Sequence, residues 1–359
     1  MKVAFVHDQL NEFGGAERVL LAISELWPTA PIYTAYCVHG SPAWERFKNR
    51  DVRTSWMQYL YPLASPLRFL APTIWNGFDF SGYDVVISSA SWYITKGFGT
   101  RGVDKKMRPV EICYCHTPPR WLYGYPTSIN WQRYKLVRLY AAIVGFFMRH
   151  YDFTAAQRVN AFIANSKETN RRIAKFYRRD STVIYPPIDL PATPVAQKRE
   201  YFLFVSRPVG SKGLELAVAV AGKLHIPLKV VGRTGVSEGS VEYLGVVTDS
   251  ELAGLYAGAR AFLALATNED FGMTPVEAMM YGTPVIAFRG GGYTESIVDG
   301  QTGILFDEPT VESLTTAIKT FLALKKDWSR DCVVQAKKFS KARFQKEFKK
   351  FVENKYHEH

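Results

Sequence analysis

Short apolar segments alternate with amphipathic ones along both halves of this chain. In the first half, residues 3–6 are apolar and precede a Gly-Gly turn and a helical pattern from about 16 to 26. The other strand-like segments are 85–88, 110–115, 161–164, 201–205, 228–231, 241–244, 261–265 and 284–287. Strands that alternate with helices favour parallel sheets with helices on both faces. The pattern therefore predicts an α/β fold.

A proline-rich segment at 185–194 separates the two halves. Prolines lack the backbone N–H that a helix interior or a central strand needs, so this segment is typical of a linker. At 359 residues the chain also exceeds what one hydrophobic core usually serves. We expect two doubly wound, Rossmann-like domains, 1–190 and 191–340, that face each other across a central cleft. Residues 341–359 should form a last helix whose apolar stripe would let it cross back to the first domain.

The charge balance favours an anionic partner. The chain has 45 basic and 33 acidic side chains, which gives a formal net charge of +12. Nucleic acid, anionic lipid and phosphorylated substrates all fit such a surface, and charge alone does not choose among them. No nucleic-acid-binding module is recognisable, so nucleic acid is the least favoured of the three.

Cysteine usage and hydropathy bear on the compartment. The four cysteines form no CxxC pair and are too sparse for a disulfide-stapled secreted domain. The N-terminus turns polar after a few apolar residues, which is too short for a signal-peptide core. The longest apolar run, 140–148, is well below the ~20 residues that span a bilayer. We therefore expect a cytoplasmic protein that is soluble or peripheral on the membrane.

The glycines at 97–102 match the pattern GxGxxG, which binds dinucleotides only where it lies between a strand and a helix. The residues that follow are largely basic and do not read as an apolar helix. We interpret this segment as a solvated loop and not as a nicotinamide or flavin site.

The segment 261–282 is the most informative part of the chain. It reads as a strand at 261–265, a loop at 267–272 and a helix at 275–281, with Thr274 as N-cap, Pro275 at the first helical position and Gly282 after the end. The positive end of such a helix could hold an anionic group such as a diphosphate. Glu277 would lie in its first turn. Spacing alone leaves open that Glu277 only complements the helix dipole and that Glu269 is a solvated loop acid.

This segment also resembles a known family signature. It is similar to the donor-binding segment of retaining GT-B glycosyltransferases of the glycosyl transferases group 1 family, in particular the bacterial GDP-mannose-dependent mannosyltransferases. The resemblance rests on the run Glu269-Asp270-Phe271-Gly272-Met273-Thr274-Pro275-Val276-Glu277. It implies that Glu277 binds the donor ribose and that Glu269 is a catalytic residue at the transferred sugar. Asp270, Phe271 and Gly272 would also contact the sugar, and Gly272, Met273 and Thr274 the diphosphate.

Two motifs in the first half agree with this resemblance. Gly14 and Gly15 follow the first strand like the family's glycine-rich loop, where glycine allows a close backbone approach and positive φ. An ordinary strand-to-helix turn is the alternative. His116, in His116-Thr117-Pro118, resembles the catalytic histidine of the mannosyltransferase branch, which contacts the transferred sugar. A purely structural histidine is the alternative there.

Two further motifs lie in the second half. Arg207 and Lys212 follow the strand at 201–205, at the spacing of the pair that grips the donor diphosphate in relatives. Such cations would offset the charge of the leaving group. Pro208 replaces the leucine that often follows the arginine. Residues 290–295 match the family's Gly-Gly-x-x-Glu element, which would bring Gly291 and Gly292 near the donor; the role of Glu295 stays open.

Basic and aromatic residues gather in the first half and suggest a surface for anionic lipid. The basic residues are Arg133, Lys135, Arg138, Arg149, Arg158, Lys167, Arg171, Arg172, Lys175, Arg178 and Arg179. The apolar and aromatic residues are Leu136, Leu139, Ile143, Phe146 and Phe147, with Trp56, Tyr59, Tyr61, Phe69 and Trp75 in a second region. A core helix with a solvated rim is the alternative.

Together these features predict a retaining glycosyltransferase that moves mannose from GDP-mannose to a lipid-linked glycan, such as a polyprenyl-diphosphate-linked acceptor, in bacterial surface polysaccharide assembly. We expect neither metal nor other cofactor, because cationic side chains and a helix end would offset the leaving charge. The alternatives are a UDP-sugar-dependent enzyme of the same family, a nucleotide-sugar epimerase or phosphorylase-like enzyme, and a non-catalytic nucleotide-sugar-binding subunit.

Overall fold

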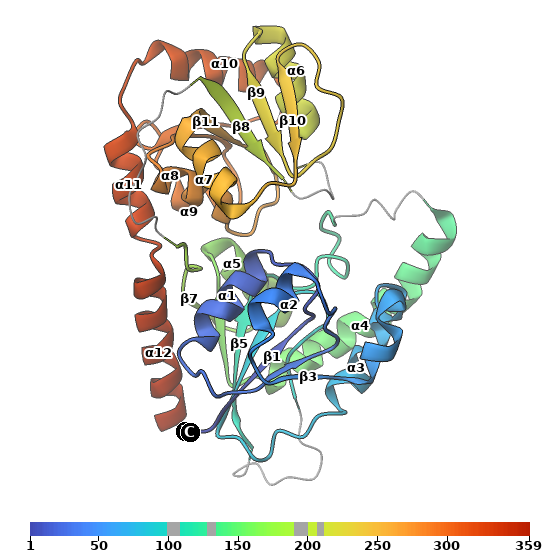
Figure 1. Ribbon diagram of the computed structural model, residues 1–359. Helices are drawn as coiled ribbons and strands as arrows, with labels where there is room; N and C mark the ends of the chain where they lie inside the picture. Colours follow the sequence, from blue (N-terminus) through green and yellow to red (C-terminus); the bar gives the residue numbers. More distant parts are fainter. Residues whose placement is uncertain (99–107, 128–133, 190–199, 207–211) are drawn as a thin grey trace. The chain divides into compact units, whose positions relative to one another are not determined.

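The computed structural model describes residues 1–98, 108–127, 134–189, 200–206 and 212–359. The chain divides into two compact units, each built on one parallel sheet (Figure 1). The first unit contains most of the chain up to Pro187 together with Ala342–His359, and the second contains Ile188–Lys341. The predicted α/β fold with two Rossmann-like sheets is confirmed.

The first sheet has the strand order β3-β2-β1-β4-β5-β6-β7, and all its neighbouring strands run parallel. Its strands are β1 (Val3–His7), β2 (Ile32–Thr34), β3 (Val52–Thr54), β4 (Val85–Ala90), β5 (Val110–Cys115), β6 (Ala161–Ala164) and β7 (Thr182–Val183). Its helical elements are α1 (Gly15–Ser24), α2 (Pro42–Phe47), η1 (Trp56–Leu63), η2 (Pro66–Leu70), α3 (Ala71–Trp75), α4 (Lys135–Arg158) and α5 (Lys167–Tyr177).

The second sheet has the order β10-β9-β8-β11-β12-β13 and is also parallel throughout. Its strands are β8 (Tyr201–Val205), β9 (Leu228–Val231), β10 (Val241–Gly245), β11 (Ala259–Ala264), β12 (Val285–Phe288) and β13 (Gly303–Phe306). The helices are α6 (Leu214–Leu224), α7 (Asp249–Gly258), α8 (Met273–Met280), α9 (Tyr293–Ser296), α10 (Val311–Ala323) and α11 (Ser329–Lys337).

The last helix, α12 (Lys341–His357), belongs to the first unit. Phe344, Phe348 and Val352 are fully buried in the core cluster that also contains Phe5 of β1 and Tyr114 of β5. These apolar side chains recur every four residues, so they form one face of the helix. The apolar stripe of α12 therefore covers the first sheet.

A buried ion pair lies beside the first sheet. The ammonium group of Lys96 contacts the carboxylate of Asp152 on α4, and both side chains are at most 2% exposed. The hydroxyl of Tyr123 donates to the other carboxylate oxygen over 2.7 Å, and that of Tyr177 donates to the first over 3.4 Å. Since buried charges are tolerated when they are paired and hydrogen-bonded, this cluster ties α4 and α5 to the segment after β5.

The strand order of each sheet reverses at one place. This switch point lies between β1 and β4 in the first sheet and between β8 and β11 in the second. Open parallel sheets bind ligands beyond the carboxyl ends of the strands at such points. The two switch points are therefore where functional side chains are expected. No helix among the described residues is long and apolar enough to cross a membrane.

Candidate functional site

His116 lies just after β5, at the carboxyl edge of the first sheet. Its backbone is held from both sides: its N–H donates to the carbonyl of Ala90 over 3.0 Å, and its carbonyl accepts from Asn165 Nδ2 over 2.9 Å and Thr169 Oγ1 over 3.2 Å. Its ring bonds through Nε2 to Ser89 Oγ at 2.8 Å. The position of the ring at this edge is therefore fixed.

The surroundings of His116 keep its imidazole neutral. Burial, followed by the proximity of His7, lowers the pKa of His116 to about 4, although Asp8 and Glu17 act in the opposite direction. A neutral imidazole has one donor and one acceptor nitrogen. At neutral pH this histidine can therefore form hydrogen bonds with a hydroxyl group of a ligand, but it does not carry a charge.

The glycine-rich turn after β1 has a different geometry from the one expected. Gly14 is the N-cap of α1 and has an extended backbone with φ −104°, and its N–H donates to Glu17 Oε2 over 2.8 Å. The expectation of positive φ is wrong, because Gly14 is the N-cap of α1, a position whose backbone is typically extended, and Glu17 in the first turn accepts its N–H. Gly15 is the first residue of that helix.

Asp8, which follows β1, organises the segment after β4. Its carboxylate accepts from the backbone N–H of Ser91 at 2.8 Å and of Trp92 at 2.6 Å, and from the hydroxyls of Ser91 and Thr95. Asp8 is only 3% exposed, so its bonds replace those that water would make. The first switch point is thus held together by hydrogen bonds between the segments that follow β1 and β4.

In the second unit, Lys212 and Glu269 meet at the switch point. Lys212 Nζ lies 3.0 Å from Glu269 Oε2, with the side chains 41% and 18% exposed. Lys212 follows β8, and Glu269 follows β11, the next strand of the sheet. A Cβ on the intervening turn residue Gly213 would lie 2.6 Å from Leu265 Cβ, so glycine lets the Lys212 turn pack closely on the end of β11. Arg207, the other predicted diphosphate ligand, lies outside the described residues.

The helix after Glu269 begins earlier than the sequence predicts. α8 starts at Met273 with Gly272 as N-cap, and not at Pro275 with Thr274 as cap. Gly272 has φ +81°, and a Cβ there would lie 2.5 Å from the ring of Tyr293. A glycine-specific turn therefore starts the helix two residues before the Thr-Pro signal. Gly282, with φ +70°, follows the helix end as predicted.

The earlier start changes the setting of Glu277. It lies in the second turn of α8 and not in the first as predicted, so the alternative that it only complements the helix dipole is not supported. Its Oε2 accepts from the hydroxyl of Tyr256 on α7 at 3.0 Å. Tyr256 is 2% exposed, so a buried hydroxyl fixes the direction of this carboxylate.

The loop between β11 and α8 packs against the glycines after β12. The N–H of Gly292 donates to the Glu269 carbonyl over 3.0 Å. A Cβ on Gly291 would lie 2.2 Å from that carbonyl oxygen, and one on Gly292 would lie 2.3 Å from Phe271 Cα. These glycines therefore support the Glu269 loop directly. The Phe271 ring is 2% exposed and packs 5.4 Å from that of Phe339, so only its backbone could contact a sugar.

Neighbouring positions complete the segment around Glu269 and α8. Asp270, Met273 and Thr274 are partly exposed. Glu295 lies within the short helix α9. Within the described ranges, no group of three or more His, Cys, Asp or Glu side chains could hold a metal ion.

Two residues of the expected lipid-binding surface are buried. Arg172 is 3% exposed, donates through Nη1 to Thr117 Oγ1 at 3.3 Å and lies over the ring of Tyr125. Trp75 is 2% exposed and donates to the carbonyl of Tyr93. Both expectations are wrong, because each side chain finds hydrogen-bond partners inside the unit. Arg172 instead fixes the residue that follows His116.

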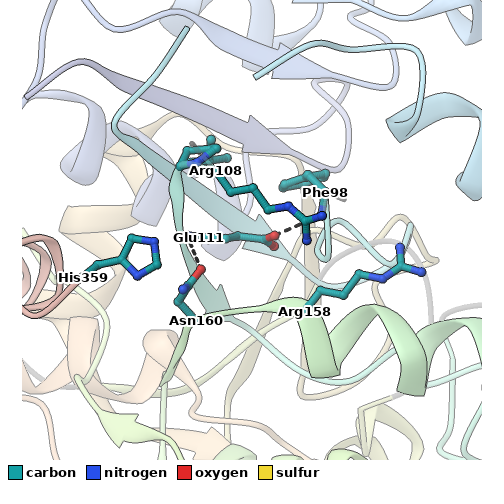
Figure 2. Close-up of a pocket in the computed structure, with 8 residues that line it drawn as sticks. Phe98, Arg108, Glu111, Arg158, Asn160 and His359 are labelled. Carbon is teal, nitrogen blue, oxygen red and sulfur yellow. Dashed lines mark hydrogen bonds between the residues drawn. The ribbon is translucent and has the colours of Figure 1, made fainter. Parts of the chain in front are cut away.

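Figure 2 shows a pocket at the opposite end of the first sheet, around Glu111. Val86, Glu111 and Asn160 line it at the amino ends of β4, β5 and β6. Burial raises the pKa of Glu111 to about 7, although its carboxylate accepts from the N–H groups of Gly97 and Phe98. Because this is the amino end of the sheet, the pocket is not the candidate site.

Gly97, the first glycine of the GxGxxG pattern, has a packing role. It has φ +71°, and a Cβ there would lie 2.4 Å from the carbonyl oxygen of Ala155 on α4. The rest of the pattern from residue 99 onward lies outside the described residues. Close packing against α4 is sufficient reason for a glycine at this position.

Models of two protein families match the chain, one in each half. The model described as Glycosyltransferase Family 4 matches residues 13–191, and the one described as Glycosyl transferases group 1 matches residues 188–339. Together they span both switch points. The chain belongs to glycosyltransferase family 4.

Curated relatives of this family 4 protein match it over parts of their length. A lipopolysaccharide core biosynthesis mannosyltransferase from Rhizobium leguminosarum is 36% identical over 106 residues, which is 30% of this chain and 28% of that protein. A glycogen synthase from Rhodospirillum rubrum is 33% identical over 149 residues, 36% of this chain and 31% of the relative. The matched segments thus span about a third or less of these relatives.

Solved structures match the family 4 fold over nearly the whole chain. Sucrose-phosphate synthase from Thermosynechococcus elongatus has a TM-score of 0.75 at 15% identity and covers 100% of both chains. HepE from Anabaena, in complex with UDP and glucose, has a TM-score of 0.71 at 16% identity, over 98% of this chain and 99% of that one. At such identities the likeness establishes the GT-B fold.

Three functional candidates in this family 4 chain were missed by sequence reasoning. Two of them are His7 and Ser89, which hydrogen bonds connect to each other and to His116. The third is Tyr256, whose hydroxyl donates to Glu277. A signal did exist for the first two, because each is a polar residue near the carboxyl end of a largely apolar strand. Their connection to His116 depends on the strand order, which the sequence pattern alone does not contain.

Proposed function

We propose that this chain is a retaining glycosyltransferase that moves a hexosyl group, mannose from GDP-mannose, to a hydroxyl of a lipid-linked glycan in bacterial surface polysaccharide assembly. The observation that carries the proposal is the Lys212–Glu269 pair at 3.0 Å, at the second switch point and directly before α8. A partly exposed cation is well placed for an anionic diphosphate, and a carboxylate beside it for sugar hydroxyls. This combination is what a nucleotide sugar requires.

The chemistry follows from where charge develops. As the bond between the anomeric carbon and the diphosphate breaks, negative charge grows on the leaving oxygen. Lys212, with the N–H groups at the start of α8, would stabilise that charge without a metal. Glu269 and the neutral His116 would orient the transferred sugar, and the acceptor hydroxyl would attack it. Glu277, held by Tyr256, would bind the ribose.

Mannose as the transferred sugar has two supports. One is the sequence from Glu269 to Met279, which is similar to GDP-mannose-dependent enzymes. The other is the partial match to a mannosyltransferase of lipopolysaccharide core biosynthesis. A UDP-sugar donor is the second candidate, because solved structures with this fold contain UDP, as in HepE with UDP and glucose.

A donor panel tests this proposal. The protein is incubated with GDP-mannose, UDP-glucose, UDP-galactose and UDP-N-acetylglucosamine and with a polyprenyl-diphosphate-linked glycan, and product mass and nucleotide release are measured. We expect GDP release and a hexose added to the acceptor with GDP-mannose. Faster transfer from a UDP-sugar would mean that GDP-mannose is not the preferred donor. Wild-type rates in both Glu269→Ala and His116→Ala would mean that these residues do not form the active site.

We further propose that the protein binds the inner face of the cytoplasmic membrane through α4. Leu136, Leu139, Ile143, Phe146 and Phe147 are 55–83% exposed and recur at helical spacing. The hydroxyl of Tyr140 contacts the carbonyl of Pro66, and its ring lies 6.5 Å from that of Phe69, so η2 extends this surface. Lys135 and Arg138 are exposed on the same helix and would attract anionic head groups.

Vesicle flotation tests the α4 surface. The probe is a vesicle of phosphatidylcholine with phosphatidylglycerol, compared with phosphatidylcholine alone. We expect Leu139→Ser/Phe146→Ser to lose binding to both kinds of vesicle. We expect Lys135→Gln/Arg138→Gln to lose only the preference for vesicles that contain phosphatidylglycerol. The matched controls change residues that are exposed elsewhere, Val236→Ser/Val334→Ser and Lys346→Gln/Lys350→Gln. Equal flotation of the α4 variants and the wild type would overturn the proposal that α4 binds the membrane.

A further inference from the structure

Four polar side chains form one hydrogen-bonded line that ends at His116. Glu17 Oε1 lies 3.4 Å from His7 Nε2, His7 Nδ1 lies 3.0 Å from Ser89 Oγ, and Ser89 Oγ lies 2.8 Å from His116 Nε2. His7 and Ser89 are register partners on β1 and β4, and each is 1% exposed. Three adjacent strands and α1 thus supply the line, across the first switch point.

The acidic end of the line sets the direction of its hydrogen bonds. Although burial acts against ionisation, the bonds from His7 and from the N–H of Gly14 keep the pKa of Glu17 below its usual value. A carboxylate only accepts, so His7 donates from Nε2. A His7 ring with its proton on Nε2 accepts through Nδ1 from the Ser89 hydroxyl. The Ser89 oxygen then accepts from Nε2–H of His116.

The last bond decides the tautomer of His116. With its proton on Nε2, the imidazole presents Nδ1 as a hydrogen-bond acceptor. Nδ1 has no hydrogen-bond partner among the residues that the structure describes. Hydrogen bonds at both N–H and C=O fix the backbone of His116. The tautomer of its ring therefore depends on the bond to Ser89.

We propose that Glu17, His7 and Ser89 are positioning residues that hold His116 as its Nε2–H tautomer and so present Nδ1 to a hydroxyl of the transferred sugar. The contact with the sugar rests on the proposed function, whereas the tautomer does not. Through the bond of Glu17 Oε2 to the N–H of Gly14, the same line ties His116 to the glycine-rich turn. The turn and the histidine are therefore parts of one unit.

The substitution Glu17→Gln tests the hydrogen-bonded line, because it should reverse the direction of each hydrogen bond from His7 to His116. The glutamine oxygen must accept from the N–H of Gly14, which leaves its NH2 group facing His7. Nε2 of His7 then accepts, its Nδ1–H donates to Ser89, and the Ser89 hydroxyl donates to Nε2 of His116. The proton of His116 moves to Nδ1. An imidazole that is not constrained would not change its tautomer on this isosteric substitution.

The tautomer is measured by long-range proton–nitrogen NMR correlation in protein labelled with nitrogen-15 histidine, at about pH 8, where unperturbed histidine is neutral. The His116 signals are assigned by their loss in His116→Gln. We expect Nε2–H in the wild type and Nδ1–H in Glu17→Gln, with Glu45→Gln on α2 as an unchanged control. The same His116 tautomer in the wild type and in Glu17→Gln would overturn the proposal.

Removing the hydroxyl in the middle of the line provides a second test. In the background of Ser89→Ala, Glu17→Gln should no longer affect the nitrogen signals of His116. A change in these signals as large as in the presence of Ser89 would overturn the proposed line.

In the transfer assay, we expect kcat of Glu17→Gln to fall on the order of tenfold, which corresponds to about 1.4 kcal/mol, with donor KM nearly unchanged. A wild type inactive with every donor would refute the proposed function, while the NMR result would still decide the line.

Discussion

The two switch points share one strand order but differ in chemistry. At the first, His7, Ser89 and His116 are joined by hydrogen bonds, and the histidine at the end is kept neutral by burial. At the second, Lys212 and Glu269 form an ion pair that is partly exposed. The same backbone plan therefore supports either an uncharged, internally bonded edge or a charged edge that water reaches.

This difference indicates how the two edges would meet a ligand. Groups that are bonded internally are already oriented, so binding requires little reorganisation of them. Charged groups in contact with solvent must give up water and part of their ion pair, but they gain strong interactions with an anion. We expect substitutions in the first unit to act largely through stability and orientation, and those in the second largely through donor binding and the rate of transfer.

The largest effect on stability is expected for Asp152→Ala. It leaves Lys96 as a buried charge without its carboxylate, which typically costs about 3–5 kcal/mol. Urea unfolding followed by tryptophan fluorescence reports chiefly on the first unit, because Trp328 is the only tryptophan after residue 190. The control is Glu45→Ala, which breaks the exposed pair with Lys48 and should cost less than about 1 kcal/mol. Equal costs would mean that the buried pair does not hold the first unit together.

The largest effect on rate is expected for Lys212→Ala. Loss of a group that stabilises the leaving diphosphate should lower kcat about 10²- to 10³-fold. Lys223→Ala is the matched control, since Lys223 is an exposed lysine of the same unit, ion-paired with Glu312. Single-turnover transfer from GDP-mannose measures the step itself. If Lys212→Ala retained the wild-type rate, the charged edge would have to act only as a structural contact.

The sequence predicted the long buried strands because their apolar runs are bounded by polar or turn residues. The bounds of β5, β6, β8 and β9 agree with the prediction. β2, β3 and β7 were missed, since two or three residues are too few to show a period. β13 was missed as well, although its residues Gly303–Phe306 are mostly apolar.

The candidate residues were easier to find than their connections. His116, Lys212 and Glu269 stand in recognisable local motifs. The partners Ser89 and Tyr256 come from other strands and helices, so they depend on tertiary structure. The start of α8 was misplaced because the positive φ of Gly272 depends on its packing against Tyr293, which a local Thr-Pro signal does not reveal.

A pH dependence of stability tests the neutral state of His116. The folded pKa of about 4 lies below the value of about 6.5 for an exposed histidine, so the unfolded chain binds more protons between these values. The contribution is complete above the unfolded pKa and is lost as the pH falls toward 4. Between pH 7 and pH 5 it should fall by about 2 kcal/mol.

The measurement is urea unfolding by tryptophan fluorescence at the two pH values. His116→Gln should remove this part of the slope, whereas His150→Gln, at an exposed position of α4, should retain it. The comparison uses the change in the free energy of unfolding between the two pH values. Any cost of losing the bond to Ser89 that does not depend on pH therefore cancels. A slope that is the same in His116→Gln and the wild type would mean that His116 titrates normally, and the contrast between the two edges would weaken.

The smallest effect is expected for Tyr256→Phe, which removes only the hydroxyl that donates to Glu277. A hydrogen bond of this kind contributes about 1 kcal/mol, so a Glu277 that is less well oriented should raise donor KM about fivefold with kcat nearly unchanged. Tyr201→Phe removes a hydroxyl of the same unit that donates to the Leu255 carbonyl, and should leave KM unchanged. A fall in kcat without a change in KM would move Glu277 from ribose binding to the reacting sugar. The second edge would then act on the reacting sugar as well as on the leaving diphosphate.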